Sequence, residues 1–182
     1  MVGATGIEPV TPAVSRQCST AELRTHYLIN YLTKCTGHSG LAGGQSLDLL
    51  YENKNLSKNK IFEMYNKKTG RLFEFSFVAP FILTNENVSK INFGKNYGSV
   101  FGTIFQITDD ILDEIDSFKE MGKTPGKDKK QGKRTLLSVL GKIKAVEFCE
   151  KLSMDFINKN KIYFNRYPAL VDLLYYNIKK LK

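Results

Sequence analysis

The stretch FGTIFQITDDILDEID, residues 101–116, decides how this sequence is interpreted. Its apolar residues recur every three or four positions, which predicts an α-helix. On that helix Asp113 lies four residues after Asp109 and three after Asp110, so we expect their carboxylates to crowd one face, with Gln106 one turn earlier. Such carboxylates repel one another, and a divalent cation relieves the repulsion. Hard oxygen ligands suit Mg²⁺, which also bridges to substrate phosphates. The alternative interpretation is a solvated acidic patch on a helix.

The rest of the chain also has helical periodicity, with little of the alternation that is typical of strands. Only three prolines follow residue 27, which favours long helices with few breaks. Ser57 is a candidate N-cap. We therefore predict an all-α fold, with helices at roughly 28–36, 40–51, 58–82, 86–118, 133–160 and 168–181.

Two further stretches carry groups suited to phosphate. Residues 118–135, FKEMGKTPGKDKKQGKRT, form a glycine-rich cationic segment that includes Lys123 and Lys133. We expect a loop there that can close over a diphosphate. Upstream, Lys68 and Thr69 offer a cation and a hydroxyl. Gly70 follows them inside a helical pattern, where glycine costs about 1 kcal/mol relative to alanine. Close approach of a neighbouring helix or of a ligand would explain why a glycine occupies this position.

Composition excludes several classes of protein. The 182 residues suffice for one domain, and no apolar run is long enough to span a membrane. The first residues lack the pattern of a secretory signal, and the three cysteines form no metal or redox motif, so we expect a cytoplasmic protein. The net charge of +9 favours anionic partners. No aromatic residues interleave the lysines as stacking platforms would require, so we expect no nucleic-acid binding.

Four stretches, in this order and spacing, resemble the polyprenyl synthetase family, and most of all the bacterial short-chain farnesyl and geranylgeranyl diphosphate synthases. They are HSGLAGGQSLDLL (38–50), KKTGRLFEFS (67–76), FGTIFQITDDILD (101–113) and GKTPGKDKKQGKRTLLSVLG (122–141). The resemblance runs from Leu28 to the C-terminus. It implies part of an isoprenoid synthase helical bundle around a central cavity, in an enzyme that condenses isopentenyl diphosphate with an allylic diphosphate and releases pyrophosphate.

The resemblance also implies roles for single residues. Asp109, Asp110 and Asp113 would be the second aspartate-rich motif and bind Mg²⁺. Gln106 matches a position beside the reacting carbons, and Gln45 and Asp48 fall in a motif that lines the cavity. The positions that hold the allylic diphosphate are matched by Lys68, Thr69, Lys123 and Lys133, of which the first three, with Gln106, are the expected catalytic residues. Proteins of this family are commonly homodimers.

The family's first aspartate-rich motif would precede Leu28, and the sequence lacks it. Residues 1–27 resemble a translated antisense tRNA gene, so we expect a leader outside the family, unstructured or spurious, followed by a C-terminal synthase portion over 28–182. A genuine but atypical extension is the alternative. Without the first motif, we expect the chain to be inactive alone.

Other functions account for less of the pattern. A non-catalytic partner subunit of a heteromeric prenyl synthase would need a helical partner that restores the missing half. A basic nucleic-acid binder would not explain the acidic cluster. A terpene cyclase also uses aspartate-rich metal motifs, but residues 44–50 and 68–70 disfavour it.

Overall fold

The computed structural model describes residues 20–121 and 135–181, with side chains for 20–115 and 135–181. Every regular element in these residues is helical, which confirms the predicted all-α class. None of the described helices is both long and apolar enough to cross a membrane. The elements are α1 (Thr20–Thr36), α2 (Leu41–Leu50), α3 (Lys58–Tyr65), the π-helical segment η1 (Asn66–Gly70), α4 (Arg71–Leu83), α5 (Val88–Met121), α6 (Leu136–Leu140), α7 (Lys142–Lys159), α8 (Lys161–Arg166) and α9 (Ala169–Lys179).

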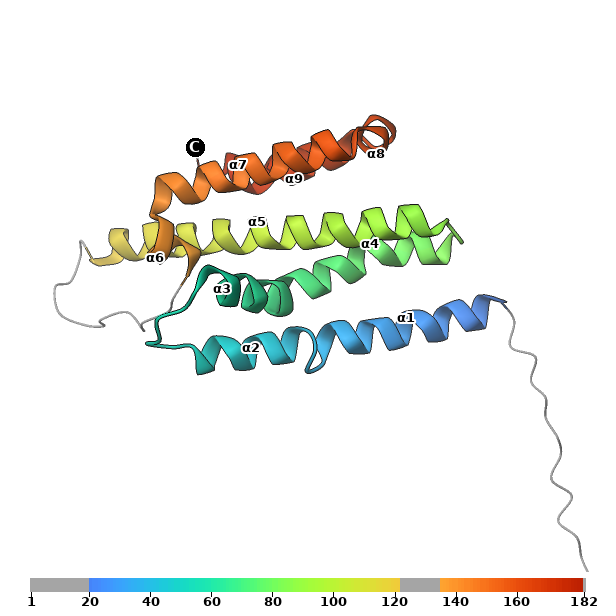
Figure 1. Cartoon of the computed structure of the whole chain (residues 1–182), viewed down its shortest axis with the longest axis horizontal. Coiled ribbons are helices and arrows are strands. Elements are labelled where there is room, and N and C mark those ends of the chain that lie inside the picture. Colours follow the sequence, from blue (N-terminus) through green and yellow to red (C-terminus); the bar gives the residue numbers. More distant parts are fainter. Residues whose placement is uncertain (1–19, 122–134, 182) are drawn as a thin grey trace, which may run out of the picture.

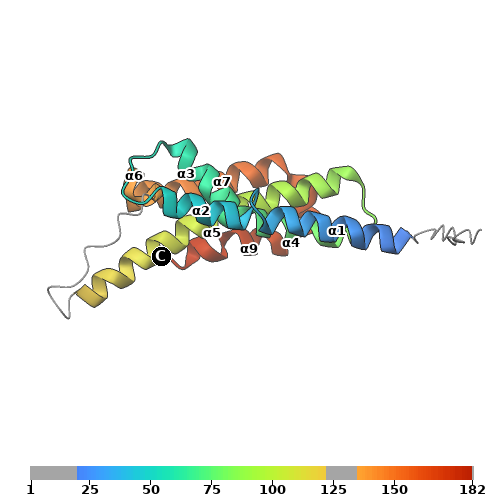
Figure 2. The ribbon, with the colours of Figure 1, turned by 90° about the horizontal axis from the view of Figure 1, so that it is seen from below.

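The long helix α5 is the centre of the arrangement. It packs against α4 on one side and against α7 and α9 on the other, while α1 packs on the outer side of α4. Figure 1 shows α1 and α2 following one another along one side of the bundle, with α7 and α9 along the opposite side. Figure 2 shows the C-terminal turns of α5 projecting beyond the other helices. The acidic stretch therefore belongs to the helix that touches most of the others.

Small residues bring α5 close to α4. Gly94, Gly98 and Gly102 are spaced four residues apart, so they lie on one face of α5. A methyl group on Gly94 would lie 2.7 Å from the carbonyl oxygen of Phe77, and one on Gly98 would overlap the backbone of Glu74. The two helix axes can be this close only because no side chain intervenes.

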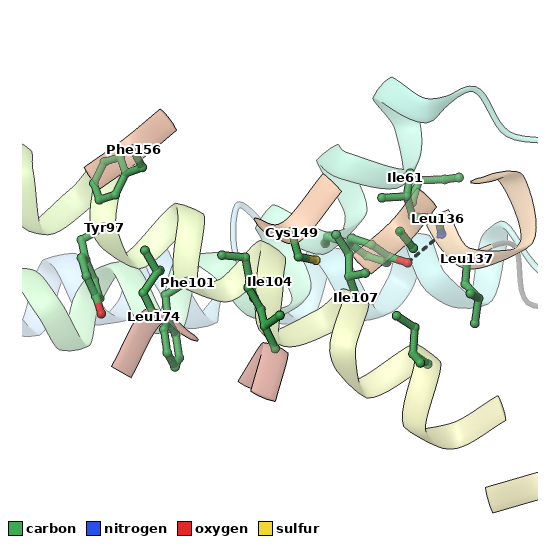
Figure 3. Close-up of a cluster of buried hydrophobic side chains, with 14 of the residues drawn as sticks. Ile61, Tyr97, Phe101, Ile104, Ile107, Leu136, Leu137, Cys149, Phe156 and Leu174 are labelled. Atoms are coloured by element: carbon green, nitrogen blue, oxygen red, sulfur yellow. Dashed lines mark hydrogen bonds between the residues drawn. The ribbon is translucent and has the colours of Figure 1, made fainter. Parts of the chain in front are cut away.

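Aromatic residues fill the core between α5 and the C-terminal helices (Figure 3). Tyr97, Phe101, Phe156 and Leu174 are buried there. The Tyr97 hydroxyl donates a hydrogen bond to the carbonyl oxygen of Leu170 at 2.7 Å. This bond fixes the start of α9 against the N-terminal part of α5.

Helix α1 begins at Thr20, eight residues before the predicted start at residue 28. Its first turns contact the bundle, because the Arg24 guanidinium donates to the carbonyl oxygen of Leu83 at 3.3 Å. Further along, the Tyr31 hydroxyl donates to the buried carboxylate of Glu74. Residues 20–27, predicted as part of an unstructured leader, are therefore helical. The earlier part of that leader lies outside the described residues.

Several predicted helices are divided in the structure. The predicted helix 58–82 comprises α3, η1 and α4. Ser57 stands at the N-cap position of α3, but its side chain makes no capping hydrogen bond. The predicted helix 133–160 is interrupted at Gly141, whose φ of 78° lies in the left-handed region that favours glycine. The predicted helix 168–181 corresponds to α9, which starts at Ala169, and the short helix α8 precedes it.

Candidate active site

The π-helical segment η1 carries Lys68 and Thr69 and is held on two sides by glycines. A side chain on Gly44 of α2 would overlap the backbone of Lys68, and a methyl group on Gly102 of α5 would lie 2.7 Å from the Cα of Gly70. Helix α5 thus comes close to the backbone at Gly70, although a side chain on Gly70 itself would first meet the side chain of Asn66 in the same segment. Short π-helical turns occur frequently at functional sites because they redirect side chains out of the regular helical pattern.

Lys68 forms an ion pair across two elements. Its Nζ lies 2.6 Å from Oδ2 of Asp48 on α2, and the two side chains are 28% and 14% exposed. An ammonium group has three donors, so this pair does not exhaust the capacity of Lys68 to bind an anion. The pairing brings together two residues from separate predicted motifs, 20 positions apart in the chain.

A chain of hydrogen bonds connects Thr69 with the acidic helix. The Thr69 hydroxyl donates to Oε1 of Gln106 at 2.6 Å, and Nε2 of Gln106 donates to Oδ1 of Asp110 at 3.1 Å. The other carboxylate oxygen of Asp110 accepts a hydrogen bond from the Tyr65 hydroxyl. That hydroxyl in turn accepts from the backbone N–H of Leu136 at 2.9 Å, the bond drawn as a dashed line at Leu136 in Figure 3.

The electrostatics of these groups follow from burial. Burial raises the pKa of Asp110 to about 6, although its bonds with Tyr65 and Gln106 act in the opposite direction. Burial and the neighbouring Asp110 carboxylate raise the pKa of the Tyr65 phenol, so the hydroxyl remains protonated and donates. Partial burial, followed by the charge of Asp113, raises the pKa of Asp109. A nearby cation would relieve the repulsion between the carboxylates of Asp109 and Asp113.

The three predicted metal ligands do not converge on one point. Asp109 and Asp113 are exposed and one turn apart, whereas Asp110 is turned toward Tyr65 and Gln106. Among the described residues, no group of three or more His, Cys, Asp or Glu side chains is arranged to hold a metal ion. The exposed carboxylates of Asp109 and Asp113 still suit Mg²⁺, which is commonly held by one or two carboxylates together with substrate phosphates and water.

Two pockets share one residue of α4. The first, of about 190 Å³, is lined by Lys68, Thr69, Leu72, Phe73 and Ser76. It places a cation and a hydroxyl at one end of an apolar wall.

The second pocket has a volume of about 370 Å³ and is also lined by Ser76. The rest of its lining, which includes Phe77, Tyr97 and Pro168, is almost entirely apolar. This volume lies within the range of about 300–1,000 Å³ that is usual for small-ligand sites. Together the two pockets suit an amphiphile with an anionic head and an apolar tail.

Comparison with known proteins agrees with this arrangement. The family described as polyprenyl synthetase matches residues 14–161. The chain belongs to the polyprenyl synthetase family. The match begins within the predicted leader, and it extends over all of the predicted site residues.

Named members of this family are similar to the chain. The farnesyl diphosphate synthase of Micrococcus luteus is 40% identical over 118 residues, which are 63% of this chain and 39% of that protein. A heterodimeric geranylgeranyl pyrophosphate synthase large subunit of Arabidopsis thaliana is 32% identical over 143 residues, covering 75% of this chain and 38% of that one. The chain thus spans well under half the length of these curated relatives.

A solved structure gives the same fold. The geranyltransferase of Helicobacter pylori, complexed with magnesium and isoprenyl diphosphate, aligns with a TM-score of 0.69 and 25% identity. The alignment covers 87% of this chain and 52% of that one. The bundle formed by α1 to α9 is therefore the isoprenoid synthase fold over about half of its length.

The structure brings together Asp48, Lys68, Thr69, Gln106 and Asp110 through the contacts given above. Of the other predicted site residues, Gln45 is exposed on α2, while Lys123 and Lys133 lie outside the described residues. Tyr65, which bonds to Asp110 at the end of this chain of hydrogen bonds, was not among the residues predicted from the sequence. A tyrosine one turn before Thr69, on the face that becomes buried, was the available signal, but the same pattern is typical of a core residue.

Proposed function

We propose that the chain supplies the diphosphate-binding side of a prenyltransferase active site, of the farnesyl diphosphate synthase type. The substrates would be isopentenyl diphosphate and an allylic prenyl diphosphate. The observation that carries this proposal is the pocket in which Lys68 and Thr69 adjoin Leu72 and Phe73. A cation and a hydroxyl suit a diphosphate, while an apolar wall suits a prenyl chain and excludes water from it.

Each residue has a definite task in this proposal. Lys68 would donate to the diphosphate oxygens while Asp48 holds its ammonium group in place. Gln106 would keep Thr69 and Asp110 in fixed positions. Asp109 and Asp113 would hold Mg²⁺, which when bound stabilises negative charge on a departing diphosphate. Lys123 and Lys133 remain predicted diphosphate ligands.

The overall reaction balances without an additional reactant. The carbon–oxygen bond of the allylic diphosphate breaks, and its electron pair leaves with the pyrophosphate. The double bond of isopentenyl diphosphate forms the new carbon–carbon bond. A proton is then lost, and the departing pyrophosphate is the base that we propose for it. Donors directed at the leaving group are the main catalytic contribution expected of the protein.

The proposal predicts that the affinity for a diphosphate rises with the length of its apolar tail. Titration calorimetry of the full chain with Mg²⁺ should detect binding of pyrophosphate, tighter binding of dimethylallyl diphosphate and still tighter binding of farnesyl diphosphate. Each additional isoprene unit would bury apolar surface, at about 25 cal/mol per Å². Pyrophosphate that fails to bind in the presence of Mg²⁺ would contradict the proposed function.

Ser76 lines both pockets, so a substitution there tests binding of the apolar tail separately from binding of the diphosphate. Ser76→Phe should place a bulky side chain where Ser76 lines both pockets and weaken farnesyl diphosphate binding about tenfold, leaving pyrophosphate binding unaffected. Ser46→Phe on α2 is a matched control, because both serines are exposed and bond to the carbonyl oxygen one turn earlier. Equal farnesyl diphosphate affinities in the two variants would exclude this path for the tail.

A second candidate function is that of a non-catalytic partner subunit. It is favoured by the apolar residues that α1 exposes, among them Leu23, Tyr27 and Ile29, which are more than half exposed. Large apolar surfaces commonly mark protein interfaces. Co-purification with a full-length short-chain synthase would reveal such a complex. In a non-catalytic subunit, Lys68→Met should leave product formation by the complex unchanged, whereas in a catalytic one it should reduce it.

A further inference from the structure

Tyr65 occupies a junction between three helices. It lies at the end of α3 with only 1% of its surface exposed, and its hydroxyl contacts Asp110 of α5 and the backbone N–H of Leu136 at the start of α6. Leu136 is itself fully buried. The hydroxyl is therefore the point at which the acidic helix is joined to the first described helix after residue 134.

The chemistry of this junction restricts which side chain can occupy it. The carboxylate of Asp110 needs a donor, and the N–H of Leu136 needs an acceptor. A phenol hydroxyl satisfies both at once, and so does a neutral imidazole, which has one donor and one acceptor nitrogen. Phenylalanine would leave the partly buried carboxylate and the buried N–H without this partner, a situation that folded proteins avoid.

The hydrogen bond from Tyr65 also means that both carboxylate oxygens of Asp110 have a donor. Gln106 holds one carboxylate oxygen and is itself bonded to Thr69, while Tyr65 holds the other oxygen. With both oxygens held, the carboxylate cannot rotate relative to the pocket that Thr69 lines. Carboxylates at metal sites are commonly held in this way by neighbouring donors.

We propose that Tyr65 is a positioning residue of the metal–diphosphate site, which fixes the Asp110 carboxylate and ties it to the backbone at Leu136. This inference rests on the proposed function, because it assumes that Mg²⁺ and a diphosphate bind beside Asp109 and Asp113. It adds a residue to which the sequence analysis assigned no role.

The test compares Tyr65→Phe with Tyr97→Phe in the full chain. Tyr97 is equally buried and its hydroxyl also bonds to a backbone group, but at the other end of α5. Mg²⁺ affinity in the presence of pyrophosphate is measured by calorimetry, and the exchange of the Leu136 amide hydrogen is followed separately. Tyr65→Phe should lower Mg²⁺ affinity about tenfold, as loss of a hydrogen-bonding partner behind the ligands of a metal site typically does, and accelerate exchange at Leu136. Tyr97→Phe should do neither.

Tyr65→His provides a rescue variant. An imidazole that donates to Asp110 and accepts from Leu136 should restore Mg²⁺ affinity to within about threefold of wild type. If Tyr65→Phe accelerates exchange at Leu136 but binds Mg²⁺ as the wild type does, Tyr65 is only structural and the inference is wrong. If Tyr97→Phe weakens Mg²⁺ binding equally, the effect is one of general stability and the inference is also wrong. A wild-type chain that binds no Mg²⁺ with pyrophosphate would contradict the proposed function itself, and the inference with it.

Discussion

Replacement of Lys68 by methionine is expected to weaken the binding of Mg²⁺-pyrophosphate by roughly 10- to 100-fold. Hydrogen bonds between charged groups contribute about 1.5–3 kcal/mol each, and every 1.4 kcal/mol corresponds to about tenfold in affinity. Lys68 is only partly exposed, and it adjoins the apolar residues of the 190 Å³ pocket, so water screens its charge less than at an open surface. Calorimetric titration with pyrophosphate at fixed Mg²⁺ measures the loss.

The neighbouring lysine provides the control for this experiment. Lys67 also belongs to η1 and also forms an ion pair, with Glu63 one turn earlier at 2.9 Å. Its pair is more exposed, and it is not among the residues that line the pocket. Lys67→Met removes the same charge from the same segment and should change pyrophosphate affinity by less than about threefold. A comparable loss in both variants would mean that only the overall charge of the segment matters.

A double variant separates the loss of the ligand from the loss of the ion pair. Lys68→Met alone leaves the Asp48 carboxylate, which is 14% exposed, without its partner, and this should destabilise the fold. Lys68→Met combined with Asp48→Asn removes both charges, so much of that destabilisation should be relieved. Pyrophosphate binding should remain weak in the double variant. Recovery of binding would show that Lys68 acts only by neutralising Asp48.

The parts of the fold that the sequence predicted are those governed by local periodicity. Helix α5 was expected at 86–118 and spans Val88–Met121, because apolar residues recur regularly along it. The π-helical form of η1 was not predictable in this way. It accompanies the contacts of Gly44 and Gly102 with its backbone, and those residues lie on other helices. A sequence pattern contains the glycines but not the neighbours that they will approach.

The early start of α1 has a similar cause. Residues 20–27 have a weak apolar pattern, and the helix exposes much of its surface. It is held against α4 through Arg24 and Tyr31, whose partners lie more than 40 positions away in the chain. Because tertiary contacts stabilise a helix more than its intrinsic propensity does, such a segment is easily missed.

For the site, spacing predicted which carboxylates are close together but not which of them points toward the interior. Successive residues on a helix differ in direction by about 100°, so Asp109 and Asp110 necessarily point to different sides. The packing of α3 and α6 turns Asp110 toward the interior, where Tyr65 is its partner. Nothing in the motif itself contains that information, because Tyr65 lies 45 positions earlier in the chain.

Replacement of Gly44 by valine is expected to have the largest effect on stability. A side chain at this position would overlap the backbone nitrogen and Cα of Lys68, and backbone atoms cannot move aside as the end of a flexible side chain can. Overpacking typically costs about 1–3 kcal/mol, and we expect the upper end of this range because the clash is with backbone. For a chain of this size such a loss corresponds to a fall in Tm of about 6–12 °C. Thermal unfolding followed by circular dichroism measures it.

The matched control for Gly44→Val is Ser46→Val, two residues further along α2. Ser46 is exposed, so this variant introduces the same β-branched residue into the same helix without a clash, and should cost only a few tenths of a kcal/mol. Gly44→Val should also weaken pyrophosphate binding, because relief of the clash must displace the segment that carries Lys68 and Thr69. A variant as stable as the control would mean that α2 can move away from η1 at little cost. If stability falls but pyrophosphate binding is retained, the clash is relieved by movement of α2 alone. Only the combined loss would establish that contact between α2 and η1 holds Lys68 and Thr69 in a position that binds pyrophosphate.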